Sequence, residues 1–143
     1  DTMWHSTEKM AYAIAEGLTS VGVPTRIMDL KTNHHSAVMT EVARCGLVVV
    51  GSPTHNNGIL PFVAGFLTYM KGLRPQNRLG AAFGSFGWSG ECVKIIGDWL
   101  KDMGFETPVE PQKTKFVPTH EALKEYATMG AALGAALAGK CSE

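Results

Sequence analysis

The sequence lacks any apolar run that approaches the roughly 20 residues needed to cross a bilayer. It also lacks an excess of either charge, because 13 Lys and Arg residues balance 13 Asp and Glu residues. A neutral chain has no basic field to hold nucleic acid and no acidic tail. We therefore expect a cytoplasmic protein that binds neither nucleic acid nor membrane.

Cysteine is scarce, and the few cysteines are far apart. Cys45, Cys92 and Cys141 form no C-x-x-C pair, which excludes a disulfide framework and a zinc site of that type. The five histidines do not supply metal ligands at the usual spacings either, since His34 and His35 are adjacent and no H-E-x-x-H occurs. We predict no metal site.

The 143 residues, 45% of them hydrophobic, are enough for a single domain over residues 1–143. Short β-branched or apolar runs predict strands, and amphipathic stretches predict helices. The expected strands are 25–28, 47–51, 79–83 and 113–117, and the expected helices are 6–18, 36–44, 61–70, 91–103 and 120–138. Ser6 or Thr7 is expected to cap the first helix, and Gly22 to stop it. Strict alternation of strand and helix predicts an α/β fold with a doubly wound parallel sheet.

One strand is missing from this pattern. Residues 1–4 have the character of a loop before a helix, yet no strand precedes them. In a doubly wound sheet of order 2-1-3-4-5 the first strand lies inside the sheet, where its loss would expose two strand edges. We therefore expect the chain to be a fragment of a longer polypeptide.

Three polar stretches are expected to meet at the carboxyl edge of the sheet, where such folds bind ligands. Residues 2–7 offer hydroxyls and helix N–H groups for an anion, although they could simply cap the helix. Residues 51–61 are rich in turn residues, although an ordinary loop would also explain the Asn57-Gly58 turn. Residues 84–91 place Trp88 among three glycines, where it could cover a flat ring or belong to the core.

These motifs together resemble a known family. T-x-x-x-S-T before the first helix, G-S-P-T-x-N-N-G-x-x-P and G-S-x-G-W-S-G are similar to the flavodoxin-like domain of flavodiiron proteins, or A-type flavoproteins. The specific parts are D-T-M-W-x-S-T-E-K-M-A at residues 1–11 and S-P-T-x-N-N-G-I-L-P at residues 52–61, and the resemblance covers nearly the whole chain.

The resemblance implies an oxidoreductase function. In that family the domain carries FMN and follows a metallo-β-lactamase-like domain, whose di-iron centre reduces O2 to water, NO to N2O, or both. That di-iron domain is absent from this sequence. The implied electron donor is a rubredoxin-like protein or a flavin reductase, and the implied assembly is a head-to-tail homodimer or a higher oligomer.

The resemblance also implies which residues contact FMN. The first loop would wrap the phosphate, the second would contact the ring and ribityl chain, and the third would close the other side. The chain differs from free flavodoxins because it is neutral and has His55, not an aromatic ring, in the second loop. The implied contacts are Thr2, Met3, Trp4, His5, Ser6, Thr7, Pro53, Thr54, His55, Asn56, Asn57, Gly58, Ser85, Phe86, Gly87, Trp88, Ser89 and Gly90.

Two other functions remain open at this point. The chain could be a stand-alone FMN-dependent quinone or azo reductase, which would need a second pocket over the ring. It could also be an interaction module of flavodoxin fold that has lost its flavin. Flavin absorbance would distinguish the flavin-free interaction module from the two flavin-binding functions. The sequence upstream of residue 1 would distinguish the flavodiiron domain from the stand-alone reductase.

Overall fold

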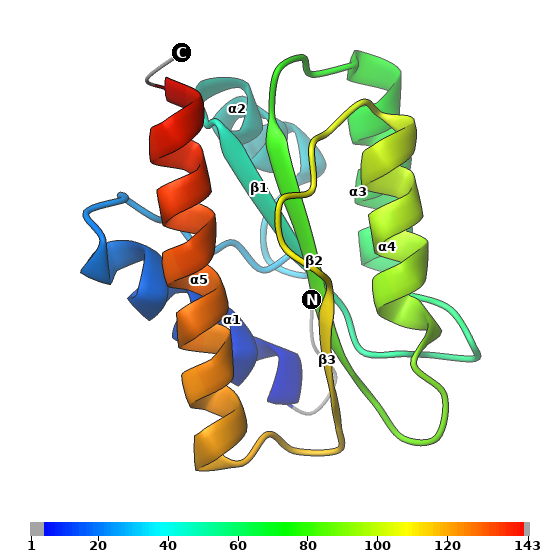
Figure 1. The fold of residues 1–143 in the computed structure, drawn as a ribbon. Coiled ribbons are helices and arrows are strands. Elements are labelled where there is room, and N and C mark those ends of the chain that lie inside the picture. Colours follow the sequence, from blue (N-terminus) through cyan, green and yellow to red (C-terminus); the bar gives the residue numbers. More distant parts are fainter. Residues whose placement is uncertain (1–4, 142–143) are drawn as a thin grey trace.

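The computed structural model describes residues 5–141 and contains a parallel sheet with helices on both faces (Figure 1). The strands are β1 (Leu47–Gly51), β2 (Leu79–Phe86) and β3 (Gln112–Lys115), in the order β1-β2-β3. β1 and β2 pair in parallel, with Leu47 opposite Leu79, and β2 and β3 pair in parallel, with Phe83 opposite Gln112. This α/β architecture, with its parallel sheet, confirms the predicted fold class.

The predicted helices all form, with ends that differ by a few residues. Pro61 begins one of them, as expected for a residue that has no N–H to lose in the first turn. Gly22 has φ +83° just after the end of the first helix, which matches its predicted role as a stop. The bounds are α1 (Ser6–Ser20), α2 (His35–Arg44), α3 (Pro61–Leu73), α4 (Glu91–Asp102) and α5 (His120–Cys141).

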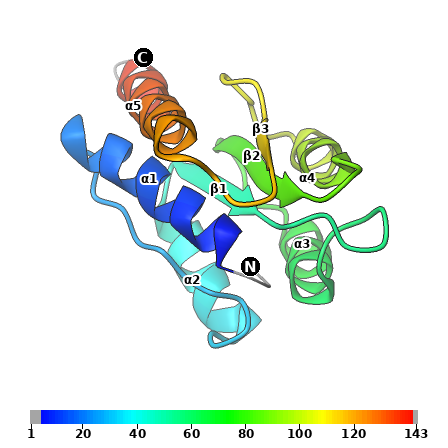
Figure 2. The ribbon, with the colours of Figure 1, turned by 90° about the horizontal axis from the view of Figure 1, so that it is seen from below.

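The helices form two layers (Figure 2). Helices α2, α3 and α4 bury a core against one face of the sheet, with Phe66, Leu67 and Ile96 at its centre. Helices α1 and α5 bury a second core on the other face, around Ile14 and Tyr126. The two cores explain why β2, which lies between β1 and β3, is buried along nearly its whole length.

Helices α1 and α5 approach each other to backbone contact. A Cβ on Gly17 would lie 1.9 Å from the Ala127 carbonyl oxygen, and a Cβ on Gly130 would lie 2.1 Å from that of Ile14. The spacing of apolar residues in α5 predicts that Met129, Ala132, Leu133, Ala136 and Leu137 face the sheet. Met129 and Leu133 are buried, but Ala132 is exposed, because the glycine stripe directs part of α5 onto α1.

Residues 25–28 were predicted as a strand, and this prediction is wrong for the described structure. They lie outside any strand, and Thr25, Arg26 and Ile27 are exposed. The physical reason is that a strand needs a neighbour to pair with its N–H and C=O groups, and no strand lies between these residues and β1. Among residues 5–141 no helix has the length and apolar character of a membrane span.

Candidate functional site

The candidate site lies where β1 and β2 end and α1 begins. Residues 52–60 follow β1, and residues 87–90 follow β2. The Thr7 hydroxyl of α1 lies 3.2 Å from the Ser85 hydroxyl of β2, and both side chains are buried. The amino end of α1 therefore meets the carboxyl edge of the sheet, as predicted.

The first loop differs in detail from its prediction. The residue that precedes α1 is His5, with φ 63° and no side-chain cap, so the prediction that Ser6 or Thr7 caps the helix is wrong. Ser6 and Thr7 lie inside the first turn, where the Thr7 hydroxyl contacts β2 and does not bond to its own helix. The first N–H groups of α1 thus lack intrahelical acceptors and carry the positive end of the helix dipole. Thr2, Met3 and Trp4 lie outside the described residues.

The second loop is closed by two kinds of hydrogen bond. The buried Ser52 hydroxyl accepts from the Leu60 amide (3.1 Å) and donates to the Pro53 carbonyl (2.8 Å). At the tip, His55 and Gly58 exchange two backbone hydrogen bonds of 3.0 and 2.8 Å. Between them Asn56 (φ 48°) and Asn57 (φ 59°) are left-handed, which is the pattern of a type I′ turn. The positive φ values of this turn therefore belong to Asn56 and Asn57 and not to Gly58.

The third loop begins inside the sheet. Ser85 and Phe86 belong to β2, and Ser85 is buried. Gly87, Ser89 and Gly90 follow around Trp88, whose exposed fraction is 94%. The alternative that Trp88 is a core residue is therefore wrong, and an indole left in solvent is available to a ligand or partner.

Side chains and backbone groups tie the three loops to one another. The Thr54 amide donates to the Ser85 carbonyl (2.7 Å), and the Ser89 hydroxyl donates to the Asn57 side-chain oxygen (3.0 Å). The Cys92 amide lies 3.4 Å from the Thr54 hydroxyl, which accepts from it. Together with the contact from Thr7 to Ser85, these bonds bring the three predicted stretches into one site.

The charges around the site are few. His5 Nδ1 lies 2.5 Å from a Glu8 carboxylate oxygen, so a charged imidazole would already have a counter-ion. The Lys113 ammonium lies 5.5 Å from the centre of the Phe86 ring. Glu91 begins α4, and its Oε2 is buried without a hydrogen-bond partner within the described part of the chain.

Two residues near the site were missed by sequence reasoning. Burial raises the pKa of the Cys92 thiol, which lies 3.8 Å from the Ser85 carbonyl. Lys113 lies so close to the third loop that a Cβ on Gly90 would be 2.8 Å from its Nζ. Both lie within elements that show only an ordinary helix or strand pattern in sequence, so no local signal marks them. No group of His, Cys, Asp or Glu side chains between residues 5 and 141 is arranged to hold a metal.

Comparisons with known proteins agree with this arrangement. The family model described as Flavodoxin matches residues 1–130. The chain is 54% identical over 140 residues to the rubredoxin-oxygen oxidoreductase of Megalodesulfovibrio gigas and 41% identical over 139 residues to the nitric oxide reductase of Moorella thermoacetica. The alignments cover 98% and 96% of this chain but only 35% of either relative, so the chain spans about a third of their length.

Solved structures show the same relationship. The rubredoxin oxygen:oxidoreductase from Desulfovibrio gigas superposes with a TM-score of 0.98 at 53% identity, over 100% of this chain and 36% of that one. The flavodiiron protein from Giardia intestinalis superposes with a TM-score of 0.94 at 31% identity, over 99% of this chain and 36% of that one. The chain therefore has the same fold as the flavodoxin-like part of these two proteins.

Proposed function

Because this chain belongs to the flavodoxin family and matches the flavodoxin-like part of flavodiiron oxidoreductases, we propose that its three tied loops hold one FMN. The observation that carries the proposal is the convergence of Thr7, Thr54 and Ser85 at the amino end of α1. A helix amino end with free N–H groups binds a phosphate group without a cation. This fits a loop whose one titratable base, His5, is already beside Glu8.

The remaining groups fit the flat part of FMN. Among residues 5–141, no heavy atom other than those of its chain neighbours lies within 4 Å of a Cβ placed on Gly87, so the third loop leaves room beside its backbone. The exposed indole of Trp88 supplies an apolar face, and the unpartnered Glu91 oxygen can accept a hydrogen bond from a ring N–H. When bound, FMN supplies one- and two-electron transfer.

In this proposal the residues of the chain bind and orient, and they do not take part in bond making. Ser6, Thr7 and the first N–H groups of α1 hold the phosphate, together with Thr2. Thr54, Asn57 and Ser89 fix the ring and ribityl chain through the bonds that already tie the second and third loops. Trp88 limits the access of water to one face or edge of the ring.

The wider function is an extension of this proposal. The relatives are named as oxidoreductases of oxygen and nitric oxide, and one name includes rubredoxin. We extend the proposal to electron transfer from a rubredoxin-like protein or a flavin reductase to a di-iron domain that reduces O2 or NO. A head-to-tail dimer, in the cytoplasm, would bring the flavin of one subunit to the metals of the other. Neither alternative, the stand-alone quinone reductase or the flavin-free module, is favoured by a specific observation.

The direct test is titration of the chain with FMN, followed by flavin absorbance and fluorescence. We expect stoichiometric binding, and Thr7→Ala should weaken it about tenfold because one hydroxyl near the phosphate is lost. Thr68→Ala is the matched control, since the Thr68 hydroxyl only bonds the Ala64 carbonyl of its own helix at an exposed position. Absence of FMN binding would support the flavin-free module. Equal affinity of Thr7→Ala and the parent chain would remove Thr7 from the site.

A further inference from the structure

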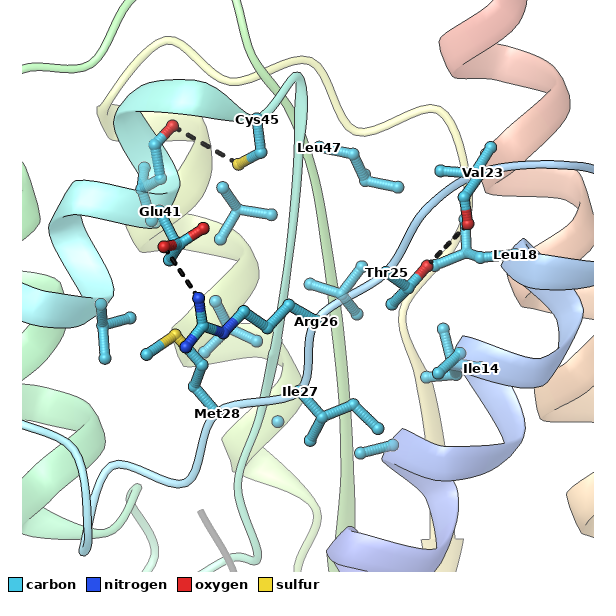
Figure 3. A pocket seen from close by; sticks show the side chains of 18 of the residues that line it. Ile14, Leu18, Val23, Thr25, Arg26, Ile27, Met28, Glu41, Cys45 and Leu47 are labelled. Atoms are coloured by element: carbon cyan, nitrogen blue, oxygen red, sulfur yellow. Dashed lines mark hydrogen bonds and ion pairs between the residues drawn. The ribbon is translucent and has the colours of Figure 1, made fainter.

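Lys113 lies beside the candidate site, and within the described part of the chain its ammonium group forms no ion pair. Several other basic side chains already have a carboxylate partner. Arg26 and Glu41, for example, lie 2.9 Å apart at the wall of a cavity next to β1 (Figure 3). The other pairs join Lys71 to Asp102, Lys94 to Asp98 and Lys140 to Glu106. The charge of Lys113 is therefore left for a ligand or for solvent.

The neighbouring residue of β3 decides which way the Lys113 side chain points. The Thr114 hydroxyl lies 2.8 Å from the hydroxyl of the buried Tyr126 of α5. Successive side chains of a strand point to opposite faces of the sheet. Helices α5 and α4 cover opposite faces (Figure 2). The contact of Thr114 with α5 thus directs Lys113 to the face that α4 covers.

The third loop provides a seat for the Lys113 side chain. In the parallel register Lys113 lies opposite Gly84, and its Nζ lies 5.5 Å from the centre of the Phe86 ring at the end of β2. A Cβ on Gly90 would lie 2.8 Å from both Nζ and Cδ of the lysine. Because glycine has no side chain, the lysine stem and its ammonium group can lie against the loop backbone. The charge is therefore held beside the loop, although the residue as a whole is exposed.

The charge of Lys113 also acts on the start of α4, directly after the third loop. Burial raises the pKa of the Cys92 thiol, and the positive charge of Lys113 is among the influences that oppose this rise. Glu91 carries the opposite charge next to Cys92, but no ion pair joins it to Lys113 in the described structure. A charge that reaches Cys92 through the third loop also reaches a ligand held by that loop.

A nearby cation distinguishes between the redox states of FMN. The isoalloxazine ring is neutral when it is oxidised, whereas its two-electron reduced form carries a negative charge at neutral pH. A positive charge beside the ring therefore stabilises the reduced form more than the oxidised form. By linkage, the site then binds reduced FMN more tightly relative to oxidised FMN, and the reduction potential rises.

We propose, building on the proposed function, that Lys113 holds its ammonium group against the third loop and thereby favours reduced FMN over oxidised FMN in the site. The lysine seat on Gly90 and Phe86 fixes where the charge lies, and the absence of an ion pair leaves that charge effective. Water and salt screen an exposed ammonium group, so the effect is moderate and depends on ionic strength. A weaker reductant can then reduce the bound flavin.

The test is the ratio of the affinities for reduced and oxidised FMN in the complete protein. This ratio follows from the shift of the FMN reduction potential on binding. At low ionic strength Lys113→Gln should lower the ratio about fivefold, which corresponds to roughly 20 mV for a two-electron couple. Lys113→Arg should keep the parental ratio, and Lys113→Glu should lower it more than Lys113→Gln does. The differences should shrink in about 0.5 M salt, where charges are screened within a few ångströms.

Lys101→Gln is the matched control, because Lys101 is an exposed lysine in the last turn of α4, at the end of the helix away from the site. It should leave the affinity ratio unchanged. Equal ratios in Lys113→Gln and the parent would overturn the proposal, and this is the result expected if the lysine only packs on the loop. A shift of the same size in Lys101→Gln, or in Lys113→Arg, would overturn it too.

The same measurements tell this role of Lys113 apart from the proposed function. If the parent protein binds no FMN, the proposed function fails, and the role of Lys113 fails with it. If the parent binds FMN but Lys113→Gln has the parental affinity ratio, only the role of Lys113 fails. If the ratio falls in Lys113→Gln and is kept in Lys113→Arg, both are supported.

Discussion

Glycine serves different purposes in two regions of this molecule. Where α1 meets α5, Gly17 and Gly130 have no space for a Cβ, which would lie about 2 Å from backbone atoms of the other helix. In the described part of the candidate site, a Cβ on Gly87 would meet nothing within 4 Å beyond its chain neighbours, and a Cβ on Gly58 would meet backbone oxygens at 3.5 and 4.0 Å. The helix glycines are explained by packing inside the chain. Packing does not explain Gly87 and Gly58, so the purpose of these two glycines lies in a ligand or in a change of backbone conformation.

The largest effect is expected in the helix pair. Gly130→Ala should lower the free energy of unfolding by about 3 kcal/mol or more, since the added methyl group meets the Ile14 carbonyl and backbone cannot move aside cheaply. Urea unfolding measures the change. Gly139→Ala in the same helix is the control, because its Cβ meets nothing, and it should be neutral or stabilise by up to about 1 kcal/mol. Equal stability of the two variants would break the comparison.

An intermediate effect is expected at Trp88. Trp88→Ala should weaken FMN binding about tenfold and reduce the quenching of flavin fluorescence, because stacking of an aromatic side chain on a flat ring contributes roughly 1–3 kcal/mol. The free energy of unfolding of the Trp88→Ala variant should equal that of the parent chain, since the indole is 94% exposed without ligand. Trp88→Phe should keep most of the affinity. Unchanged flavin affinity and fluorescence in the alanine variant would mean that another group covers the ring.

The smallest effect is expected at Gly58, and it sharpens the comparison most. Gly58 does not have positive φ here, and a Cβ is tolerated, so Gly58→Ala should leave the stability and oxidised FMN binding almost unchanged. A peptide flip that turns the Asn57 carbonyl toward reduced flavin would need positive φ at Gly58, which alanine resists by about 1 kcal/mol. The two one-electron reduction potentials should then move closer by roughly 40 mV. Identical potentials in a spectroelectrochemical titration would leave Gly58 as a plain turn residue.

Local pattern was enough to predict the strands and helices that pair or pack among the described residues. Leu47–Gly51 forms a strand with the predicted bounds, and Pro61 begins its helix as expected. Residues 25–28 have the same β-branched character but form no strand, because pairing is a property of the neighbour as well as of the sequence. The helix cap was misassigned for a related reason, since the Thr7 hydroxyl has a tertiary partner, Ser85, that no local rule contains.

The site shows the same division between local and tertiary information. The three loops and their edge of the sheet followed from motif and topology. The hydrogen bonds between Thr54 and Ser85 and between Ser89 and Asn57 could not be predicted in this way, because they join residues more than thirty positions apart. The left-handed pair Asn56 and Asn57 was partly visible, since asparagine tolerates positive φ almost as a glycine does, but which residues of the turn adopt it depends on the hairpin register.

The parallel register of the sheet has a kinetic consequence. Leu47 pairs with Leu79, and Phe83 pairs with Gln112, so each strand pair of the described sheet joins positions about thirty residues apart. Neither pair can therefore form as a local hairpin. Such distant pairings make the sheet slower to form than the locally paired contacts of a helical bundle. During that interval its apolar strands are uncovered and open to other chains. The yield of refolded protein should therefore fall as the protein concentration during refolding rises.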